Sequence, residues 1–385
     1  MIYFDNAAST RPLPEVVSLF GEMALTYYAN PASQNPLAIE GEEVLKKART
    51  TLASLIHAQS PEEIFFTSGG TESNNWAIFG TAAAYAKRGR HVLTTPVEHP
   101  AVLMPYEQLR KQGFTVEILP VDEAGRVRPE DLLAALRPDT ILVSTILVNN
   151  ETGAVQDVET LGKIIREHSD AVYHVDAVQA FGKMPIHVGH THIDLLSASG
   201  HKFHAPKGLG FLYRRKGLLT RPILFGGGHQ WGQRPGTENP AGAAALALAA
   251  KRSYEDLEHH TSQVRRVKER LWQEVSSRLE DVFLNGPSLE ESSPYVLNLR
   301  FSGLRGPELL NALEEKGIYA SAGSACNTKK KVQSSVLSAL GLSEEEITGS
   351  LRFSFCRENT EQEAVQCAMA LAEIVPVLRH FHRKR

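Results

Sequence analysis

Short apolar runs alternate with longer amphipathic stretches between about residue 60 and residue 214. The runs are rich in β-branched and aromatic residues and predict strands, whereas several of the stretches between them have the spacing of helices. The predicted strands are 63–67, 91–95, 115–120, 140–148, 171–177, 193–199 and 208–214, and the predicted helices are 72–87, 100–112, 129–136 and 157–168. This alternation predicts a mostly parallel sheet with helices on both faces.

The pattern changes after about residue 240. Helical spacing continues over one long region, 240–280, and shorter strands at 295–301 and 351–355 are mixed with helices beyond it. Such a mixture is typical of an α+β domain. The sequence therefore predicts an α/β protein in which a large, sheet-based domain is followed by a smaller one.

Length and composition restrict the possible function classes. The chain has 385 residues, of which 42% are hydrophobic and 22% charged, as is ordinary for a soluble globular protein. A formal net charge of −3 gives no general attraction to nucleic acid or to an anionic membrane. No apolar run approaches the roughly 20 residues of a membrane span, and the first residues lack a secretory pattern. We therefore expect a cytoplasmic protein that binds neither membranes nor nucleic acid directly.

Polar residues gather in the loops that follow the predicted strands, where doubly wound sheets bind ligands. The loop after 63–67 begins Ser-Gly-Gly-Thr, in which Gly70 permits close backbone approach. Thr71 is expected to cap the next helix, and the N-terminus of a helix suits phosphate. A simple capped turn without a ligand is the alternative.

Three other strand ends carry candidate residues. Asp176 and Gln179 can face one site, where a buried carboxylate needs a partner such as a protonated ring nitrogen; a salt bridge or a helix cap is the alternative. His99 can stack on an aromatic ring or transfer protons, although a single histidine is more often structural. Asn150 is either a ligand contact or a turn residue.

The segment Ser-Ala-Ser-Gly-His-Lys-Phe-His-Ala-Pro-Lys-Gly, residues 197–208, places Lys202 at a strand end beside Ser199 and His201. Desolvation and nearby cations lower the pKa of an amine toward neutrality, as a lysine that reacts with a carbonyl requires. A surface lysine is the alternative. The recurrence of polar motifs at strand ends instead favours an aldehyde cofactor with a phosphate and a ring nitrogen, such as pyridoxal 5′-phosphate (PLP).

The three cysteines are too few and too late in the chain for a disulfide framework. Cys326 follows small residues and precedes three lysines, 329–331, whose charge lowers the pKa of a thiol; a chance cysteine beside a solvated basic run is the alternative. Cys356 and Cys367 are expected to be inert packing residues on a strand and a helix. No metal site is predicted from the histidines of one polar connection, His187, His190 and His192.

In combination, these motifs resemble the cysteine desulfurases of the NifS/IscS class, PLP enzymes of fold type I within the class V aminotransferases. The resemblance runs nearly end to end, from Tyr-Phe-Asp-Asn-Ala-Ala-Ser-Thr (3–10) to Leu-Arg-Phe-Ser-Phe (351–355). It implies a large PLP-binding domain over 15–255, with a mostly parallel mixed sheet covered by helices. A small α+β domain, formed by 1–14 and 256–385, would carry the Cys326 loop.

The resemblance also implies roles for individual residues. Lys202 would bind the cofactor covalently, His99 would stack on its ring and assist proton transfer, and Cys326 would be the nucleophile. Thr237 would reach the phosphate of the neighbouring subunit in a homodimer. Asn150 and Arg352 would bind the substrate carboxylate. Asp176 would pair with the ring nitrogen of the cofactor and Gln179 with its ring oxygen, and the remaining cofactor contacts would come from Gly70, Thr71, Asn150, Ser199 and His201.

The implied reaction converts L-cysteine to L-alanine and leaves a persulfide on Cys326. The sulfur would then pass to an acceptor protein, either an iron–sulfur scaffold or a tRNA-thiolation relay. A PLP lyase or aminotransferase acting on another amino acid, such as selenocysteine, is the main alternative, and a non-catalytic assembly partner is another. Gly-Gly-Gly-His-Gln (226–230) and Asn35 depart from the family pattern, which affects the expected rim of the pocket rather than the cofactor chemistry.

Overall fold

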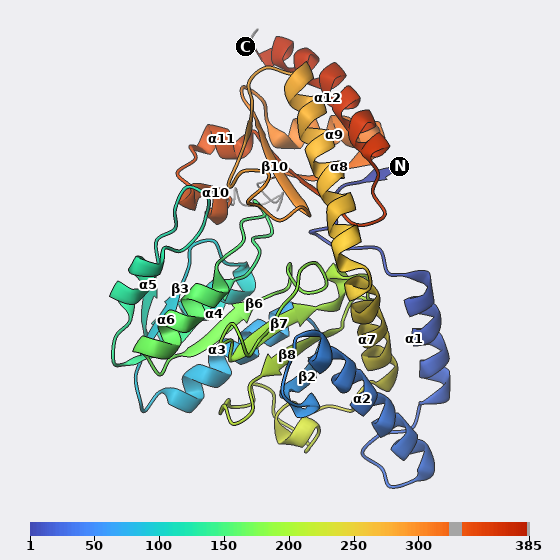
Figure 1. Ribbon diagram of the computed structural model, residues 1–385, viewed down its shortest axis with the longest axis vertical. Coiled ribbons are helices and arrows are strands. Elements are labelled where there is room, and N and C mark those ends of the chain that lie inside the picture. Colours follow the sequence, from blue (N-terminus) through green and yellow to red (C-terminus); the bar gives the residue numbers. More distant parts are fainter. Residues whose placement is uncertain (323–332, 383–385) are drawn as a thin grey trace.

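The computed structural model describes residues 1–322 and 333–382. Its larger part is built on a seven-stranded sheet with the order β2-β8-β7-β6-β5-β3-β4 (Figure 1). The strands are β2 (Ile64–Thr67), β3 (His91–Thr94), β4 (Thr115–Ile118), β5 (Thr140–Ile146), β6 (Val172–Asp176), β7 (Leu195–Ser199) and β8 (Gly210–Arg214). Neighbours from β7 to β4 are parallel, and β8 is antiparallel to both β7 and β2. The predicted mostly parallel sheet is confirmed.

Helices cover both faces of this sheet because successive side chains of a strand point to opposite sides. Val172 and Leu195 pack on one face, against α3 (Gly70–Tyr85) and α4 (Pro100–Lys111). The following residues of the same strands pack on the opposite face. The helices of that face are α1 (Pro14–Thr26), α2 (Pro36–Leu55), α5 (Pro129–Ala135), α6 (Val158–His168) and α7 (Pro240–Tyr254).

The smaller part has a four-stranded antiparallel sheet with the order β12-β13-β10-β9. Its strands are β9 (Val282–Leu284), β10 (Val296–Phe301), β12 (Ser321–Ala322) and β13 (Ser350–Ser354), and its helices are α8 (Leu257–Arg278), α9 (Gly306–Glu315), α10 (Ser335–Ala339), α11 (Glu344–Thr348) and α12 (Glu361–His382). The N-terminal strand β1 (Ile2–Tyr3) pairs in parallel with β11 (Ile318–Tyr319). The chain therefore starts in the smaller part, whereas the domain limits at residues 14 and 255 stay a prediction.

The helical region predicted over 240–280 is two helices rather than one. Asp256 has a left-handed backbone, with φ of 49° and ψ of 35°, and it separates α7 from α8. A left-handed residue cannot continue a right-handed helix. The longer helix α8 then extends away from the seven-stranded sheet and along α12 (Figure 1).

The sequence led us to expect no stretch that approaches a membrane span, but among the described residues one helical segment, Glu361–Phe381 of α12, is long and apolar enough to cross a membrane. The same helix packs against α8 and buries Cys367, Leu371 and Val375 in the core of the smaller part. A buried core helix passes the same test of length and composition. Cys356 was expected on a strand, but it lies beyond the end of β13, where its N–H donates to Asn359 Oδ1 at 2.9 Å. Both cysteines are buried, as expected.

Candidate active site

A cavity of about 410 Å³ opens at the carboxyl ends of the parallel strands, where the larger and smaller parts of the protein meet. The fold brings most of the predicted site residues to its wall: Gly70, Thr71, His99, Asn150, Asp176, Gln179, Ser199, His201, Lys202 and Arg352. Thr237 lies elsewhere, exposed beside a separate hollow of about 200 Å³. Cys326 lies outside the described residues.

Lys202 ends a short 3₁₀ turn, Gly200–Lys202, that directly follows β7. Its Nζ donates to the carbonyl oxygens of Ala7 and Ala8, at 2.6 and 2.8 Å. Burial, reinforced by the charge of Arg352, lowers the pKa of this amine to about 8, although Asp5 and Asp176 oppose the shift. The neutral, nucleophilic amine is therefore far more populated near neutral pH than it is in an exposed lysine.

Asp176 ends β6 and is 2% exposed. Its Oδ2 accepts from Asn74 Nδ2 at 2.7 Å, and its Oδ1 accepts from the N–H of Val178 at 2.9 Å. These donors are neutral, and no ion pair with another described residue compensates the carboxylate. A buried carboxylate of this kind favours a protonated ring nitrogen as its partner.

His99 is the N-cap of α4, because its Nδ1 accepts from the N–H of Ala101 at 3.0 Å. In the neutral ring this contact places the proton on Nε2. Burial lowers the pKa of His99; Asp176 opposes this shift and Lys202 reinforces it. The neutral imidazole is therefore the form available at the cavity wall near pH 7.

The start of α3 differs from the expectation in one respect. The N-cap is Gly69, with φ of +144°, and no side chain caps the helix, so the predicted capping role of Thr71 is wrong. Thr71 is instead exposed within the first turn, where the free N–H groups suit an anion. A Cβ added at Gly70 would meet Val178 Cγ2 at 2.7 Å. The close approach of the Gly70 backbone to Val178 therefore requires glycine.

His201 forms another part of the wall beside this turn. Its Nδ1 lies 3.3 Å from Ser9 Oγ. Burial, reinforced by Lys202, Lys207 and Lys183, lowers the pKa of His201 to about 4, so the ring is neutral at pH 7. A neutral ring offers one N–H to a ligand without adding a charge.

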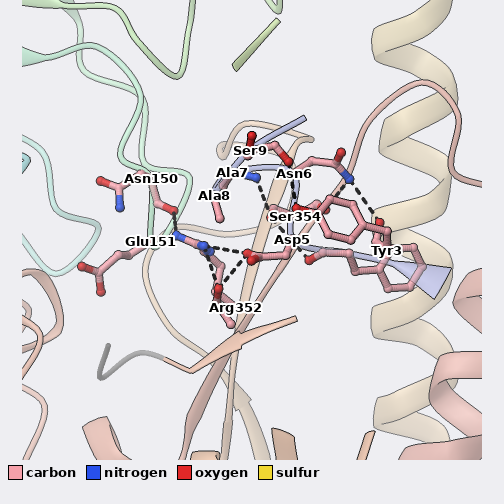
Figure 2. Close-up of polar contacts among 12 residues, drawn as sticks. Tyr3, Asp5, Asn6, Ala7, Ala8, Ser9, Asn150, Glu151, Arg352 and Ser354 are labelled. Atoms are coloured by element: carbon pink, nitrogen blue, oxygen red, sulfur yellow. Dashed lines mark hydrogen bonds and ion pairs between the residues drawn. The ribbon is translucent and has the colours of Figure 1, made fainter. Parts of the chain in front are cut away.

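Arg352 reaches the cavity from β13, in the smaller part of the protein. Its Nη2 donates to Asp5 Oδ1 at 2.8 Å and to Ser321 Oγ at 3.0 Å, while its Nη1 donates to the carbonyl of Asn150 at 3.0 Å. Figure 2 shows the guanidinium held between Asp5 and the Asn150–Glu151 backbone. Its Nε is buried without a hydrogen-bond partner among the described residues. The fork is thus oriented at a position where a carboxylate can bind.

Sequence reasoning missed several residues that hold this site. Asp5 and Ser321 orient Arg352, and Asn74 holds Asp176. Asp5 lies within the noted motif Tyr-Phe-Asp-Asn-Ala-Ala-Ser-Thr, and Asn74 lies three residues after the noted motif Ser-Gly-Gly-Thr. Nothing in the local spacing of those motifs indicates which of their polar residues face the cavity.

Glu98, next to His99 in the chain, is a further missed group and is 1% exposed. Its Oε1 accepts from Thr95 Oγ1 at 2.7 Å and from the N–H of Ile146 at 2.8 Å. Its Oε2 has no hydrogen-bond partner among the described residues. Burial, reinforced by the charge of Asp176, raises the pKa of Glu98 to about 8. The carboxyl is therefore mostly protonated at neutral pH.

Replacing Glu98 by glutamine is expected to stabilise the protein at alkaline pH and not at acidic pH. The carboxyl has an ordinary pKa of 4.5 and a pKa of about 8 in the folded chain, so the free energy of unfolding falls as pH rises between these values. Glutamine keeps the neutral shape and does not titrate. Urea unfolding of both chains should show a difference that grows to the order of 3 kcal/mol between about pH 5 and pH 8. A difference that does not change with pH would contradict the assignment.

The lining of the cavity fits PLP. Lys202 supplies an amine for an aldehyde, Asp176 a carboxylate for a ring nitrogen, and the glycine-lined first turn of α3 a phosphate site. Asn74 Oδ1 is also buried without a partner among the described residues. Unpartnered buried polar atoms indicate that the cavity is shaped for a ligand.

Comparisons with known proteins agree with this geometry. The family model of class V aminotransferases (Aminotransferase class-V) matches residues 2–366. A cysteine desulfurase of Nostoc sp. is 40% identical over 379 residues, covering 98% of this chain and 94% of the relative. A NifS/IcsS protein homolog of Lactobacillus delbrueckii subsp. bulgaricus is 38% identical over 384 residues, covering 100% of this chain and 98% of the relative.

Solved structures show the same relationship. A NifS-like protein matches with a TM-score of 0.92 and 36% identity, covering 98% of this chain and 100% of that chain. SspA in complex with cysteine matches with a TM-score of 0.81 and 33% identity, covering 93% of this chain and 99% of that chain. The predicted family, the fold type and PLP as the cofactor are confirmed. This chain belongs to the class V aminotransferase family.

Proposed function

We propose that the protein is a PLP-dependent cysteine desulfurase, which converts L-cysteine to L-alanine and leaves the sulfur as a persulfide on Cys326. The observation that carries the proposal is the meeting of Lys202, Asp176, His99 and Arg352 in one cavity. Relatives named cysteine desulfurase and a related protein bound to cysteine support the choice of substrate.

When bound, PLP supplies an electron sink that makes the Cα–H bond of an amino acid acidic. The residues of this chain prepare that chemistry. Lys202 would hold the aldehyde of the cofactor through its amine, and its Nζ is placed to carry the proton removed from Cα. Asp176 keeps a proton on the ring nitrogen, and His99 offers a neutral Nε2–H at the wall.

Arg352 binds the carboxylate of the substrate and so fixes which side of the amino acid faces Lys202. Groups of the N-terminal segment, β12 and the loop after β5 hold the guanidinium at Nη1 and Nη2. The side chain therefore loses little conformational freedom when the substrate binds. A planar fork matches a carboxylate with two parallel hydrogen bonds. Asn150 adds its side-chain amide at the same wall.

The sulfur transfer balances without an added oxidant. The thiolate of Cys326 attacks the sulfur of the substrate and forms an S–S bond, while the Cβ–S bond breaks and its electron pair remains on Cβ. Proton uptake at Cβ, together with the return of a proton from Lys202 Nζ to Cα, completes L-alanine. Cys326 is left as a persulfide, from which a thiol acceptor or a reductant takes the outer sulfur.

We also propose that the enzyme is a cytoplasmic homodimer that passes its sulfur to an acceptor protein of iron–sulfur assembly or tRNA thiolation. The position of Thr237, exposed and apart from the cavity of its own chain, supports a role at the phosphate of a partner subunit. The large domain over 15–255 and the small domain formed by 1–14 and 256–385 belong to the same proposal.

The product balance tests this function. The purified protein, supplied with PLP, L-cysteine and a thiol reductant, is expected to form L-alanine and sulfide in equal amounts. Both products are quantified in the same reaction, by amino-acid analysis and by a sulfide assay. Pyruvate or another keto acid in place of alanine would instead identify a lyase or an aminotransferase. A matched reaction without the added reductant should form alanine more slowly, because the persulfide is then discharged by the thiol of the substrate alone.

A further inference from the structure

A second lysine, Lys183, is buried directly behind the cavity wall and has no part in the proposed reaction. It lies in the turn that follows β6, four residues after Gln179, so the two side chains lie on the same side of a helical turn. Lys183 Nζ donates to Gln179 Oε1 at 3.0 Å. Lys183 is 8% exposed and Gln179 is 4% exposed. This contact is therefore shielded from water.

The surroundings of Lys183 do not compensate a positive charge. Its Nζ lies 5.6 Å from the centre of the Tyr295 ring, and Gln179 Oε1 is its hydrogen-bond acceptor. In the part of the chain that the structure describes, the titratable or charged residues that line the small cavity shared with Lys183 include no carboxylate; they are Lys202, His204, His260, Tyr295, Cys356 and Arg357. Burial, reinforced by the charge of Lys202, lowers the pKa of Lys183 to about 7. Burying an amine whose charge no carboxylate neutralises lowers the stability of the folded chain. We therefore expect Lys183 to have a role at the PLP site.

The contact decides how the amide of Gln179 is oriented. Because Lys183 donates to Oε1, the amide nitrogen must face the opposite way, where Nε2 donates to the carbonyl of Ala7 at 2.9 Å. Ala7 lines the main cavity, and its carbonyl also accepts from Lys202. An amide nitrogen carries two hydrogens, so one N–H of Gln179 remains for a ligand in the cavity.

We propose that Lys183 is a positioning residue of the PLP site: it holds the amide of Gln179 so that its free N–H faces the ring oxygen of the cofactor. The proposal rests on the site assigned above, in which Gln179 contacts that oxygen. Without Lys183 the amide can turn over and present Oε1 to another oxygen, which is repulsive. Lys183 thus acts on the cofactor through Gln179 and not by direct contact.

A double-mutant cycle tests the proposal with PLP as the probe. The affinity for PLP of the full-length chain, freed of cofactor, is measured for the parent, Lys183→Met, Gln179→Ala and the double variant. Each single variant is expected to bind roughly tenfold more weakly, and the double variant no more weakly than Gln179→Ala. Lys183→Arg keeps a donor and is expected to restore most of the affinity. A folding check by thermal unfolding accompanies each chain.

Lys268 provides the matched control. It is another buried lysine, 1% exposed, whose pKa burial lowers to about 7, but its Nζ bonds to Ser292 and Ser293, away from the PLP site. Lys268→Met should leave PLP affinity unchanged even where it lowers the unfolding temperature. If Lys183→Met does not fold, Lys183→Leu takes its place in the cycle, because its apolar side chain also leaves Gln179 Oε1 without a donor.

The outcomes separate this proposal from the assignment on which it rests. Independent, multiplying losses of affinity in the double variant would show that Lys183 does not act through Gln179 and would overturn the proposal. Parent-like affinity in Lys183→Met, beside a weakened Gln179→Ala, would also overturn it and leave the site assignment intact. Parent-like affinity in Gln179→Ala would overturn both the proposal and the role assigned to Gln179.

Discussion

The Lys202→Ala chain is expected to lose the visible absorbance of bound PLP and to turn over L-cysteine at least about a thousandfold more slowly. Lys202 supplies the one amine that lines the cavity wall among the described residues, and its pKa of about 8 leaves part of it neutral at pH 7.5. Alanine removes this nucleophile together with its two hydrogen bonds to Ala7 and Ala8. Absorbance spectra after dialysis and an alanine assay measure both effects.

Two further measurements make the Lys202 result specific. Lys216→Ala, which removes an exposed lysine outside the cavity, should keep both the absorbance and the activity. Borohydride reduction of the parent protein loaded with PLP, followed by peptide mass analysis, should place the cofactor on Lys202. Retained colour in Lys202→Ala, or label on buried Lys183 instead, would show that the wrong lysine has been assigned.

The Cys326→Ala chain is expected to keep the absorbance of bound PLP but to release sulfide at least about a hundredfold more slowly in the presence of a reductant. The other two cysteines cannot replace it. Burial raises the pKa of Cys356 to about 11 and raises that of Cys367 further, so neither thiol offers an appreciable amount of thiolate near neutral pH. Sulfide release, alanine formation and the absorbance spectrum are compared with those of the parent.

Cys367→Ala is the control for this variant, because it removes a thiol that is buried in α12. It should release sulfide at the parental rate as long as it folds. Trapping of the persulfide with a thiol-alkylating reagent before reduction should mark Cys326 in the parent and in Cys367→Ala. Full turnover by Cys326→Ala would end the persulfide mechanism.

The periodicity of the sequence predicted the strands of the main sheet well, because most of them are short, apolar and bounded by polar loops. All seven strands of the main sheet lie within or overlap their predicted ranges, from β2 to β8. The failures were local. Asp256 breaks the helical region over 240–280 through its own backbone angles, and the α3 N-cap is Gly69 rather than Thr71. Neither the break at Asp256 nor the position of the N-cap at Gly69 can be read from the spacing of hydrophobic residues.

By itself, the sequence determined the order of strands and helices, the placement of polar loops at the carboxyl ends of the strands, and through these the family and its cofactor. The tertiary structure alone decided which side chains meet there. Asp5 pairs with Arg352 across 347 positions, Lys202 bonds to Ala7 and Ala8, and Asn74 bonds to Asp176. Such contacts depend on strand order and on the N-terminal segment that lies between the two parts. Local periodicity records which face of an element is buried, but it carries no information about the partner against which that face is packed.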